Sequence, residues 1–178
     1  TVVALAAMAR CPVATLVVAP IRDLMYQWQR RIRAGLGYDA GILGDGRYEK
    51  WPVTVTTYDS AYIHMEQIGA KYDLVIFDEE HHLPAPTLSQ AAEFCAAPCR
   101  LGLTATPERA DGAHVRLDEL IGPVVWRQEI ADARGESLAD FRTVRIPVAL
   151  QEDEQRRYDE LGRQVRVDLL DVRDLAAV

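Results

Sequence analysis

The chain has 178 residues, of which 49% are hydrophobic and 26% are charged, a composition typical of a globular domain with a hydrophobic core and not of a disordered or fibrous protein. It contains no apolar run of the roughly 18 residues that a membrane span requires, its start lacks the basic residues of a signal peptide, and its three cysteines are too few for a disulfide framework, so we expect a reduced, intracellular protein. The net charge of −7 does not favour a nucleic-acid partner, yet it does not exclude one, because phosphate contacts depend on local patches rather than on totals.

The first part of the chain is predicted to alternate helices with short strands. Residues 1–10 are rich in alanine and predict a helix, and the run Thr15–Ala19 predicts a buried strand. The segment 21–34 predicts a second helix, because its hydrophobic residues recur on one face. These residues are Ile21, Leu24, Met25, Trp28 and Ile32. Arg22 falls in the first turn of this helix, after the end of a strand, where a phosphate could dock.

A strand, a turn and another strand follow. Residues 40–43 predict a short strand, the glycines and aspartate within 44–52 predict a turn or hairpin, and the β-branched run 53–57 predicts the next strand. A helix is expected after it. Asp59 and Ser60 near its start suit a helix N-cap, and the same carboxylate and hydroxyl groups could instead meet a nucleic-acid backbone.

The chain is organised around an unbroken apolar run, Leu74–Phe77, that predicts a strand buried on both faces. Asp78 and Glu79 follow it, at the carboxyl end of the strand, where open α/β sheets bind their ligands. One carboxylate could hold Mg²⁺ through water while the next orients or deprotonates an attacking water. On these residues alone, a polar strand end that turns into a solvated loop explains the pattern equally well.

A second strand exit follows. After two prolines, residues 88–94 predict a helix and residues 100–103 a strand, which ends at Thr104 and Thr106. Hydroxyl groups at this position could sense the state of the carboxylates through hydrogen bonds. They could also serve only as local caps of a tight turn.

The last third of the chain is predicted to contain a linker and a long helix. Residues 112–120 predict a helix and residues 124–126 a strand fragment. The linker is assigned to a polar stretch, and the strand expected over 143–148 leads into an amphipathic helix from Gln151 onward. The domain division expected is 1–130, a linker over 131–142, and 143–178.

Four motifs, taken in order along the chain, resemble those of superfamily-2 helicases, and within them the XPB-type DNA helicases and translocases. The matching segments are Val18–Trp28 (motif Ia), Val55–Tyr62 (motif Ib), Val75–Leu83 (the DExH box, motif II) and Leu101–Gly112 (motif III with the Arg-Glu-Asp element). The resemblance covers nearly the whole chain. It implies the α/β, RecA-like fold of P-loop NTPases, three layers around a mainly parallel sheet, here without the first strand and phosphate loop and followed by the start of a thumb-like helical insertion.

The resemblance implies roles for residues at a nucleotide site that takes ATP and Mg²⁺. Asp78 would coordinate the Mg²⁺ of Mg-ATP, and Glu79 would activate the hydrolytic water. His81 would couple the nucleotide site to motif III through Thr104 and Thr106.

The resemblance also implies backbone contacts to DNA that do not depend on sequence. The implied nucleic-acid residues are Arg22, Thr57, Tyr58, Asp59, Arg109 and Asp111. The last two match the ends of the strand-separating Arg-Glu-Asp element, and Ala110 stands where that element has its acid.

Two parts of such an enzyme do not occur in these residues. One is the phosphate loop G-x-x-x-x-G-K-[ST], whose last residue, a second Mg²⁺ ligand, would by family spacing be Thr1. The other is the second RecA-like lobe, which is an expected partner. We therefore expect that this chain alone neither hydrolyses ATP appreciably nor unwinds DNA. A nuclease or repair partner, no membrane partner and, in a prokaryote, a cytoplasmic location at the nucleoid are also expected.

Three alternatives stay open. The chain could belong to an RNA helicase or to a restriction-type translocase subunit. It could instead be a nucleic-acid-binding scaffold that uses no nucleotide. A metal site built from Asp78, Glu79, His81 and His82 is the third alternative, although nothing in their spacing resembles a zinc pattern.

Overall fold

The computed structural model describes residues 1–106, 112–128 and 144–175. The chain divides by compactness into two units, Thr1–Arg127 and Gln128–Val178, which are described separately. Among the described residues, no helix combines the length and the hydrophobicity that crossing a bilayer requires.

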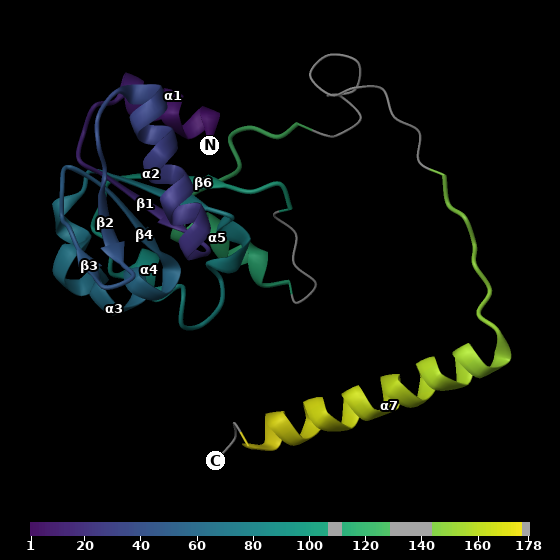
Figure 1. Cartoon of the computed structure of the whole chain (residues 1–178). Helices are drawn as coiled ribbons and strands as arrows, with labels where there is room; N and C mark the ends of the chain where they lie inside the picture. Colours follow the sequence, from purple (N-terminus) through teal and green to yellow (C-terminus); the bar gives the residue numbers. More distant parts are fainter. Residues whose placement is uncertain (107–111, 129–143, 176–178) are drawn as a thin grey trace. The chain divides into compact units, whose positions relative to one another are not determined.

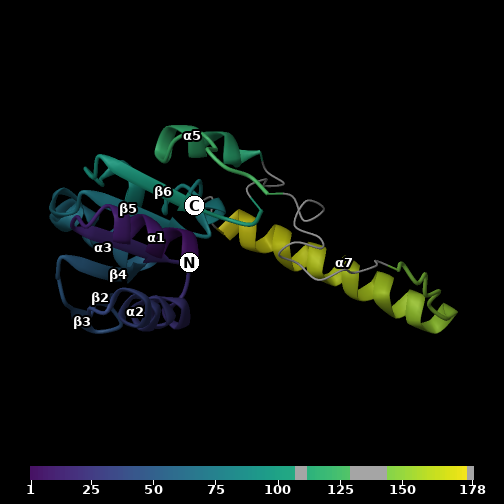
Figure 2. The same ribbon diagram turned by 90° about the horizontal axis from the view of Figure 1, so that it is seen from above.

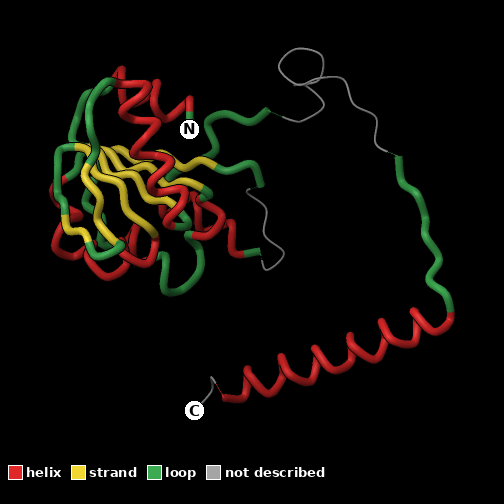
Figure 3. Tube along the Cα trace, viewed as in Figure 1, coloured by secondary structure: helices red, strands yellow, loops and turns green. Residues whose placement is uncertain are grey.

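The first unit is built on a six-stranded sheet with the order β3-β2-β4-β1-β5-β6. The strands are β1 (Thr15–Ala19), β2 (Gly41–Gly44), β3 (Arg47–Tyr48), β4 (Val53–Thr57), β5 (Leu74–Asp78) and β6 (Cys99–Leu103). Every neighbouring pair is parallel except the β2–β3 hairpin, which is antiparallel. The sheet is therefore mixed and mostly parallel, and its strands lie between helices, as Figure 3 shows.

Helices follow most of the parallel strands. In the first unit they are α1 (Val2–Arg10), α2 (Arg22–Leu36), α3 (Tyr58–Ile68), α4 (Gln90–Glu93) and α5 (Leu117–Leu120), with 3₁₀ turns η1 (Gly69–Lys71), η2 (Glu80–His82) and η3 (Ala113–Arg116). Gly37 ends α2 in the left-handed region, at φ +79°, a conformation that glycine adopts without a steric penalty. Parallel strands are usually joined by a helical crossover, and in this unit the parallel pair β2–β4 differs, because β3 and loops connect its two strands.

Alternate residues of the central strands face opposite helical layers, because successive side chains of a strand point to opposite sides. Val17 on β1 belongs to the core cluster that contains buried residues of α1 and α2, whereas its neighbour Val18 belongs to the cluster that contains buried residues of α3, α4 and α5. Ile76 and Phe77 on β5 divide in the same way. All four side chains are 0% exposed, and each contributes about 2 kcal/mol of apolar burial. Figure 1 and Figure 2 show the resulting layers of helices around the strands.

The second unit consists, in its described part, of an extended segment and one long helix. The helix, α7, spans Glu152–Leu175. Glu154 accepts a hydrogen bond from the backbone N–H of Gln151 at 2.9 Å, and acidic residues fill the first turn, where they stabilise the helix dipole. The predicted long helix is thus confirmed.

Most of the predicted elements are confirmed, and four differ. The helix predicted over 88–94 is reduced to the short α4, and the segment 112–120 contains the 3₁₀ turn η3 before α5. The strands predicted over 124–126 and 143–148 are wrong, since residues 124–126 and 144–148 have no regular structure. The hydrophobic side chains of both segments are exposed, and their backbone joins no sheet among the described residues. β-Branched residues alone do not form a strand without a neighbouring strand to pair with. The predicted linker, 131–142, lies outside the described residues.

Candidate active site

The residues singled out by sequence converge on one edge of the sheet. Strands β1, β4, β5 and β6 are parallel, and their registers bring their carboxyl ends into line. Ala19 of β1 is level with Thr57 of β4, and Asp78 of β5 is level with Leu103 of β6. The acids after β5, the start of α3 after β4 and the hydroxyls after β6 therefore share this edge.

Asp78, the last residue of β5, is held by two buried aromatic residues. The indole N–H of Trp28 on α2 donates a hydrogen bond to Oδ2 of Asp78 at 2.7 Å. The hydroxyl of Tyr58 on α3 donates to the backbone carbonyl of Asp78 at 3.1 Å. Trp28 is 1% exposed and Tyr58 is 2% exposed, so both hydrogen bonds start from the core. The carboxylate and the backbone of Asp78 are each fixed from a different helix.

Glu79 has a strained backbone. Its φ of +54° lies in the left-handed region, and among the described residues Asp45 is the other non-glycine residue with a positive φ. For a residue with a Cβ this conformation costs about 1 kcal/mol, a cost that is typical of functional sites. The turn ends β5 abruptly, and Oε2 of Glu79 lies 3.4 Å from Nδ1 of His81.

The structure brings His81 and Thr104 together. Nδ1 of His81 lies 3.0 Å from the hydroxyl oxygen of Thr104, which follows β6. The same oxygen accepts a hydrogen bond from the backbone N–H of Thr106 at 3.1 Å. Thr104 therefore serves as a local cap and also touches the histidine, whereas Thr106 takes part through its backbone. Whether these contacts couple two sites stays a prediction.

Sequence reasoning assigned no role to Glu80, the third acid of the run. Its carboxylate occupies the space beside Gly102 on β6, where the Cβ of any other residue would overlap it. Burial raises the pKa of Glu80 above its usual value. Burial, followed by the charges of Asp78, Glu80 and Glu79, raises the pKa of Tyr58 well above its usual range. Gly102 is level with Phe77, the residue just before the acidic run, and a glycine at this position of the neighbouring strand is a signal that an analysis of strand pairing could have used.

The N-termini of α2 and α3 frame a cavity of about 320 Å³ at the same edge. It is lined by Pro20, Ile21, Arg22, Asp45, Thr57, Asp59 and Ser60. The positive end of a helix dipole favours an anion such as a phosphate, and two helices present this end to the cavity. Arg22 is the basic residue of the lining, so the predicted residues Arg22, Thr57 and Asp59 meet in one pocket.

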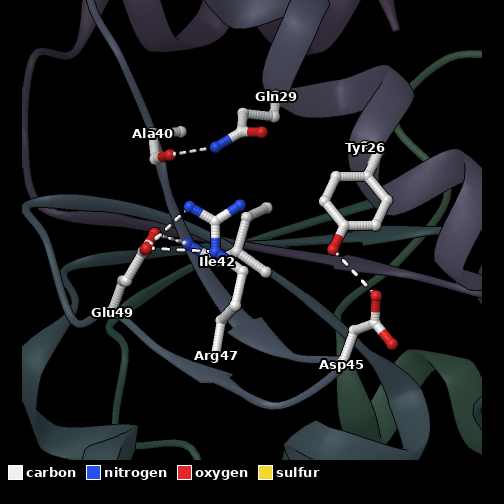
Figure 4. A network of polar contacts seen from close by, with 7 residues as sticks. All are labelled: Tyr26, Gln29, Ala40, Ile42, Asp45, Arg47 and Glu49. Atoms are coloured by element: carbon white, nitrogen blue, oxygen red, sulfur yellow. Dashed lines mark hydrogen bonds and ion pairs between the residues drawn. The ribbon is translucent and has the colours of Figure 1, made fainter.

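Asp45 brings a negative charge to this pocket from the β2–β3 turn. Its Oδ1 pairs with Nη1 of Arg22 at 2.8 Å, and its Oδ2 accepts a hydrogen bond from the hydroxyl of Tyr26 at 2.9 Å. Figure 4 shows Tyr26 reaching Asp45, next to the Arg47–Glu49 pair of the same hairpin. Glu49 also accepts from the N–H of Ile42 at 3.0 Å, and this hydrogen bond, followed by Arg47, lowers the pKa of Glu49. These contacts fix the hairpin and with it Asp45.

Two predictions concern the start of α3. Tyr58 is buried and its hydroxyl donates to the carbonyl of Asp78, so the structure offers little side-chain surface for the predicted contact with nucleic acid, which stays a prediction. The N-cap of α3 is Thr57, whose hydroxyl accepts the N–H of Ser60 at 3.3 Å, and not Asp59 or Ser60. The cap lies two positions before Asp59 and three before Ser60, and α3 therefore begins at Tyr58, whose side chain is buried.

Two of the remaining site residues lie outside the described residues, and the third is present. Arg109 and Asp111 fall in the gap after residue 106. The hydroxyl of Thr1 accepts a hydrogen bond from Nη1 of Arg31. Arg31 and Trp28 are one turn apart on α2, so Thr1 and Asp78 are tied to neighbouring turns of the same helix.

The oxygen donors at the end of β5 fit Mg²⁺ bound together with a nucleotide. Of the two carboxylate oxygens of Asp78, Oδ2 accepts the hydrogen bond from Trp28 in the described part of the chain, so Oδ1 can face a metal. Mg²⁺ is usually held by one or two carboxylates with water and substrate phosphates completing the shell. No group of three or more His, Cys, Asp or Glu side chains gathers in the part of the chain that the structure describes, so the zinc-type alternative gains no support from it.

Residues 1–109 match the family of type III restriction enzymes, res subunit. The chain is 44% identical over 175 residues to the DNA 3'-5' translocase XPB2 of Sulfurisphaera tokodaii, a match that covers 98% of this chain and 40% of that protein. It is 31% identical over 170 residues to the DNA 3'-5' helicase XPB of Mycobacterium tuberculosis, covering 89% of this chain and 31% of that protein. It is 29% identical over 123 residues to the probable helicase D10 of Escherichia phage T5, covering 68% of this chain and 27% of that protein. The chain thus spans 40% or less of the length of these relatives.

Proposed function

The chain belongs to the ResIII family, the res subunits of type III restriction enzymes, and from this membership we propose that it forms the first ATPase lobe of an XPB-type DNA helicase or translocase. The whole protein would couple ATP hydrolysis to movement on duplex DNA, or to its opening, in repair or transcription. The observation that carries the proposal is the meeting of an Asp78–Glu79 pair and a pocket between two helix N-termini at one edge of the sheet.

At the nucleotide site, Asp78 and the hydroxyl of Thr1 would hold Mg²⁺. The metal, bound with ATP, neutralises charge that develops on the transferred phosphoryl group. Glu79 orients the attacking water and accepts its proton, and its strained backbone keeps the carboxylate at the exit of β5. His81 holds Thr104 in hydrogen-bond distance, which supports a role for this pair in linking the nucleotide site to motif III.

At the pocket, Arg22 and the N-termini of α2 and α3 would bind phosphates of a DNA strand. Such contacts fix position without reading sequence, and their strength falls with salt. Arg109 and Asp111 stay candidates for the strand-separating element on the strength of the motif alone. A second RecA-like lobe and a nuclease or repair protein are the partners proposed, and in a prokaryote the protein would act at the nucleoid.

A restriction-type translocase subunit is the second candidate, because the family is described by restriction enzymes. The experiment that tests the proposal measures ATP hydrolysis by the complete protein with double-stranded DNA, single-stranded DNA and RNA of equal length. Stimulation by DNA and not by RNA supports a DNA translocase. Equal stimulation by RNA would favour an RNA helicase, and no hydrolysis under any condition would favour a scaffold that uses no nucleotide.

A further inference from the structure

Asp78 is reached by two aromatic side chains that come from the two helices framing the phosphate pocket. Trp28 lies on α2, six residues after Arg22, and Tyr58 directly follows Thr57 at the start of α3. Their indole N–H and phenol O–H are donated to the carboxylate and to the carbonyl of this one residue. About 9 Å of helix separates Trp28 from Arg22 along α2.

Packing alone does not account for this arrangement. A phenylalanine at either position would fill the core without bringing a polar group that needs a partner. The Trp28 bond at 2.7 Å ends on a carboxylate, and such charge-assisted hydrogen bonds are shorter and stronger than neutral ones. The two donors come from positions 50 and 20 residues away, and both end on the residue proposed to hold the metal.

We propose that Trp28 and Tyr58 are positioning residues that connect the phosphate pocket to the metal carboxylate of Asp78. A phosphate that docks on the N-termini of α2 and α3 shifts these helix ends, and the two hydrogen bonds transmit the shift to the orientation of Asp78. This inference rests on the proposed function. The connection runs along α2 and α3 and is separate from the His81–Thr104 contact, which reaches the site from β6.

The same connection must act in both directions. If DNA at the pocket changes the affinity of the site for Mg-nucleotide, then Mg-nucleotide changes the affinity for DNA by the same factor. The coupling can therefore be measured as binding, without turnover. Trp28→Phe and Tyr58→Phe each remove one donor and keep an aromatic ring in the core.

The experiment uses the complete protein and a fluorescent single-stranded oligonucleotide. The Kd for the oligonucleotide is measured with and without Mg²⁺ and a non-hydrolysable ATP analogue. In the parent protein we expect the two Kd values to differ by about fivefold or more. In Trp28→Phe and in Tyr58→Phe we expect the Kd values measured with and without nucleotide to agree within about twofold.

Two matched variants control for the loss of an aromatic N–H or O–H elsewhere. Trp51 is 46% exposed and precedes β4, so it lies at the amino ends of the parallel strands, whereas the site lies at their carboxyl ends. Tyr62 on α3 is 40% exposed. Trp51→Phe and Tyr62→Phe should keep the parent ratio. In protein labelled with 5-fluorotryptophan, the ¹⁹F signal that Trp28→Phe removes should move when the oligonucleotide binds without nucleotide, and the signal that Trp51→Phe removes should not.

The outcomes separate the inference from the function on which it rests. If the Kd of the parent protein for the oligonucleotide does not change with Mg-nucleotide, both the inference and the proposed function are overturned. A parent protein that shows the coupling while both folded variants keep it overturns the inference alone. Thermal unfolding identifies a variant that no longer folds, and because the two donors lie on different helices, the other variant still decides the question.

Discussion

Replacing Asp45 by asparagine should tighten the binding of single-stranded DNA. The carboxylate of Asp45 forms an ion pair with Arg22 at 2.8 Å inside the phosphate pocket. There it competes with a phosphate for the guanidinium group and repels the phosphate by its negative charge. The side chains of Arg22 and Asp45 are 71% and 34% exposed, and an ion pair of this kind is worth up to about 1 kcal/mol. Releasing it should strengthen DNA binding by up to about fivefold. Asparagine tolerates the φ of +52° at this turn and keeps an acceptor for Tyr26.

The assay is fluorescence anisotropy of a labelled oligonucleotide over a series of KCl concentrations. Arg22→Gln should weaken binding and reduce the log–log salt slope by about 0.7, the value for one phosphate contact on a single strand. The chain offers a matched control on the same helix. Arg33 in the last turn of α2 pairs with Asp39 at 3.1 Å, and it does not line the pocket. Arg33→Gln and Asp39→Asn make the same charge changes and should leave the slope unaltered.

The reasoning about the pocket can fail in two ways. If Asp45→Asn binds DNA no more tightly than Asp39→Asn, the Arg22–Asp45 pair does not compete with phosphate. If Arg22→Gln and Arg33→Gln reduce the salt slope equally, Arg22 contributes to DNA binding only through the overall charge of the protein. The cavity of about 320 Å³ is then not the phosphate site.

Three further predictions concern the same edge. Burial raises the pKa of Glu80, so the protonated acid stabilises the folded state at pH values below its unfolded pKa near 4.5, and this contribution is lost as pH rises through the folded pKa. Glu80→Gln should therefore raise the melting temperature at pH 7 and not at pH 4. An equal rise at both pH values would contradict this prediction. Thr57→Ala removes the N-cap of α3 and should cost about 1 kcal/mol in urea unfolding, whereas Thr57→Ser should cost less; equal losses would argue against the cap. Thr104→Val removes the hydroxyl beside His81, a contact worth about 1 kcal/mol, and should lower DNA-stimulated ATP turnover about fivefold more than basal turnover; a proportionate loss of both would refute the coupling.

Sequence patterns predicted the parts of the fold in which local and global requirements agree. The run Leu74–Phe77 predicted a strand buried on both faces. The stripe of 21–34 predicted the buried face of α2, except for Ile21, which precedes the helix and is exposed. The strand over 143–148 failed because alternating apolar residues form a strand only when a neighbour pairs with them, and pairing is not a local property. Sequence separation likewise hid the most specific contact of the site, from Trp28 to Asp78 across 50 residues.

The start of α3 shows how the position of a helix cap decides which side chain enters the core. The sequence predicts the cap at Asp59 or Ser60, but the hydroxyl of Thr57 can also cap a helix, and in the structure it does. With the cap at Thr57, the ring of Tyr58 enters the core and its hydroxyl reaches the end of β5. The hydroxyl of Tyr58 therefore donates to the backbone carbonyl of Asp78, a contact that the sequence pattern did not predict.

The most direct test of the account is ATP turnover by the complete protein carrying Glu79→Gln, with Mg-nucleotide binding measured alongside. Asp78 is unchanged in this variant, so nucleotide should bind with a Kd within about threefold of the parent value, while the loss of the base should lower DNA-stimulated turnover by a factor of about 10² to 10⁴. Turnover at the parent rate would contradict the claim that the two acids after β5 act in ATP hydrolysis, Asp78 by holding the metal and Glu79 by activating water.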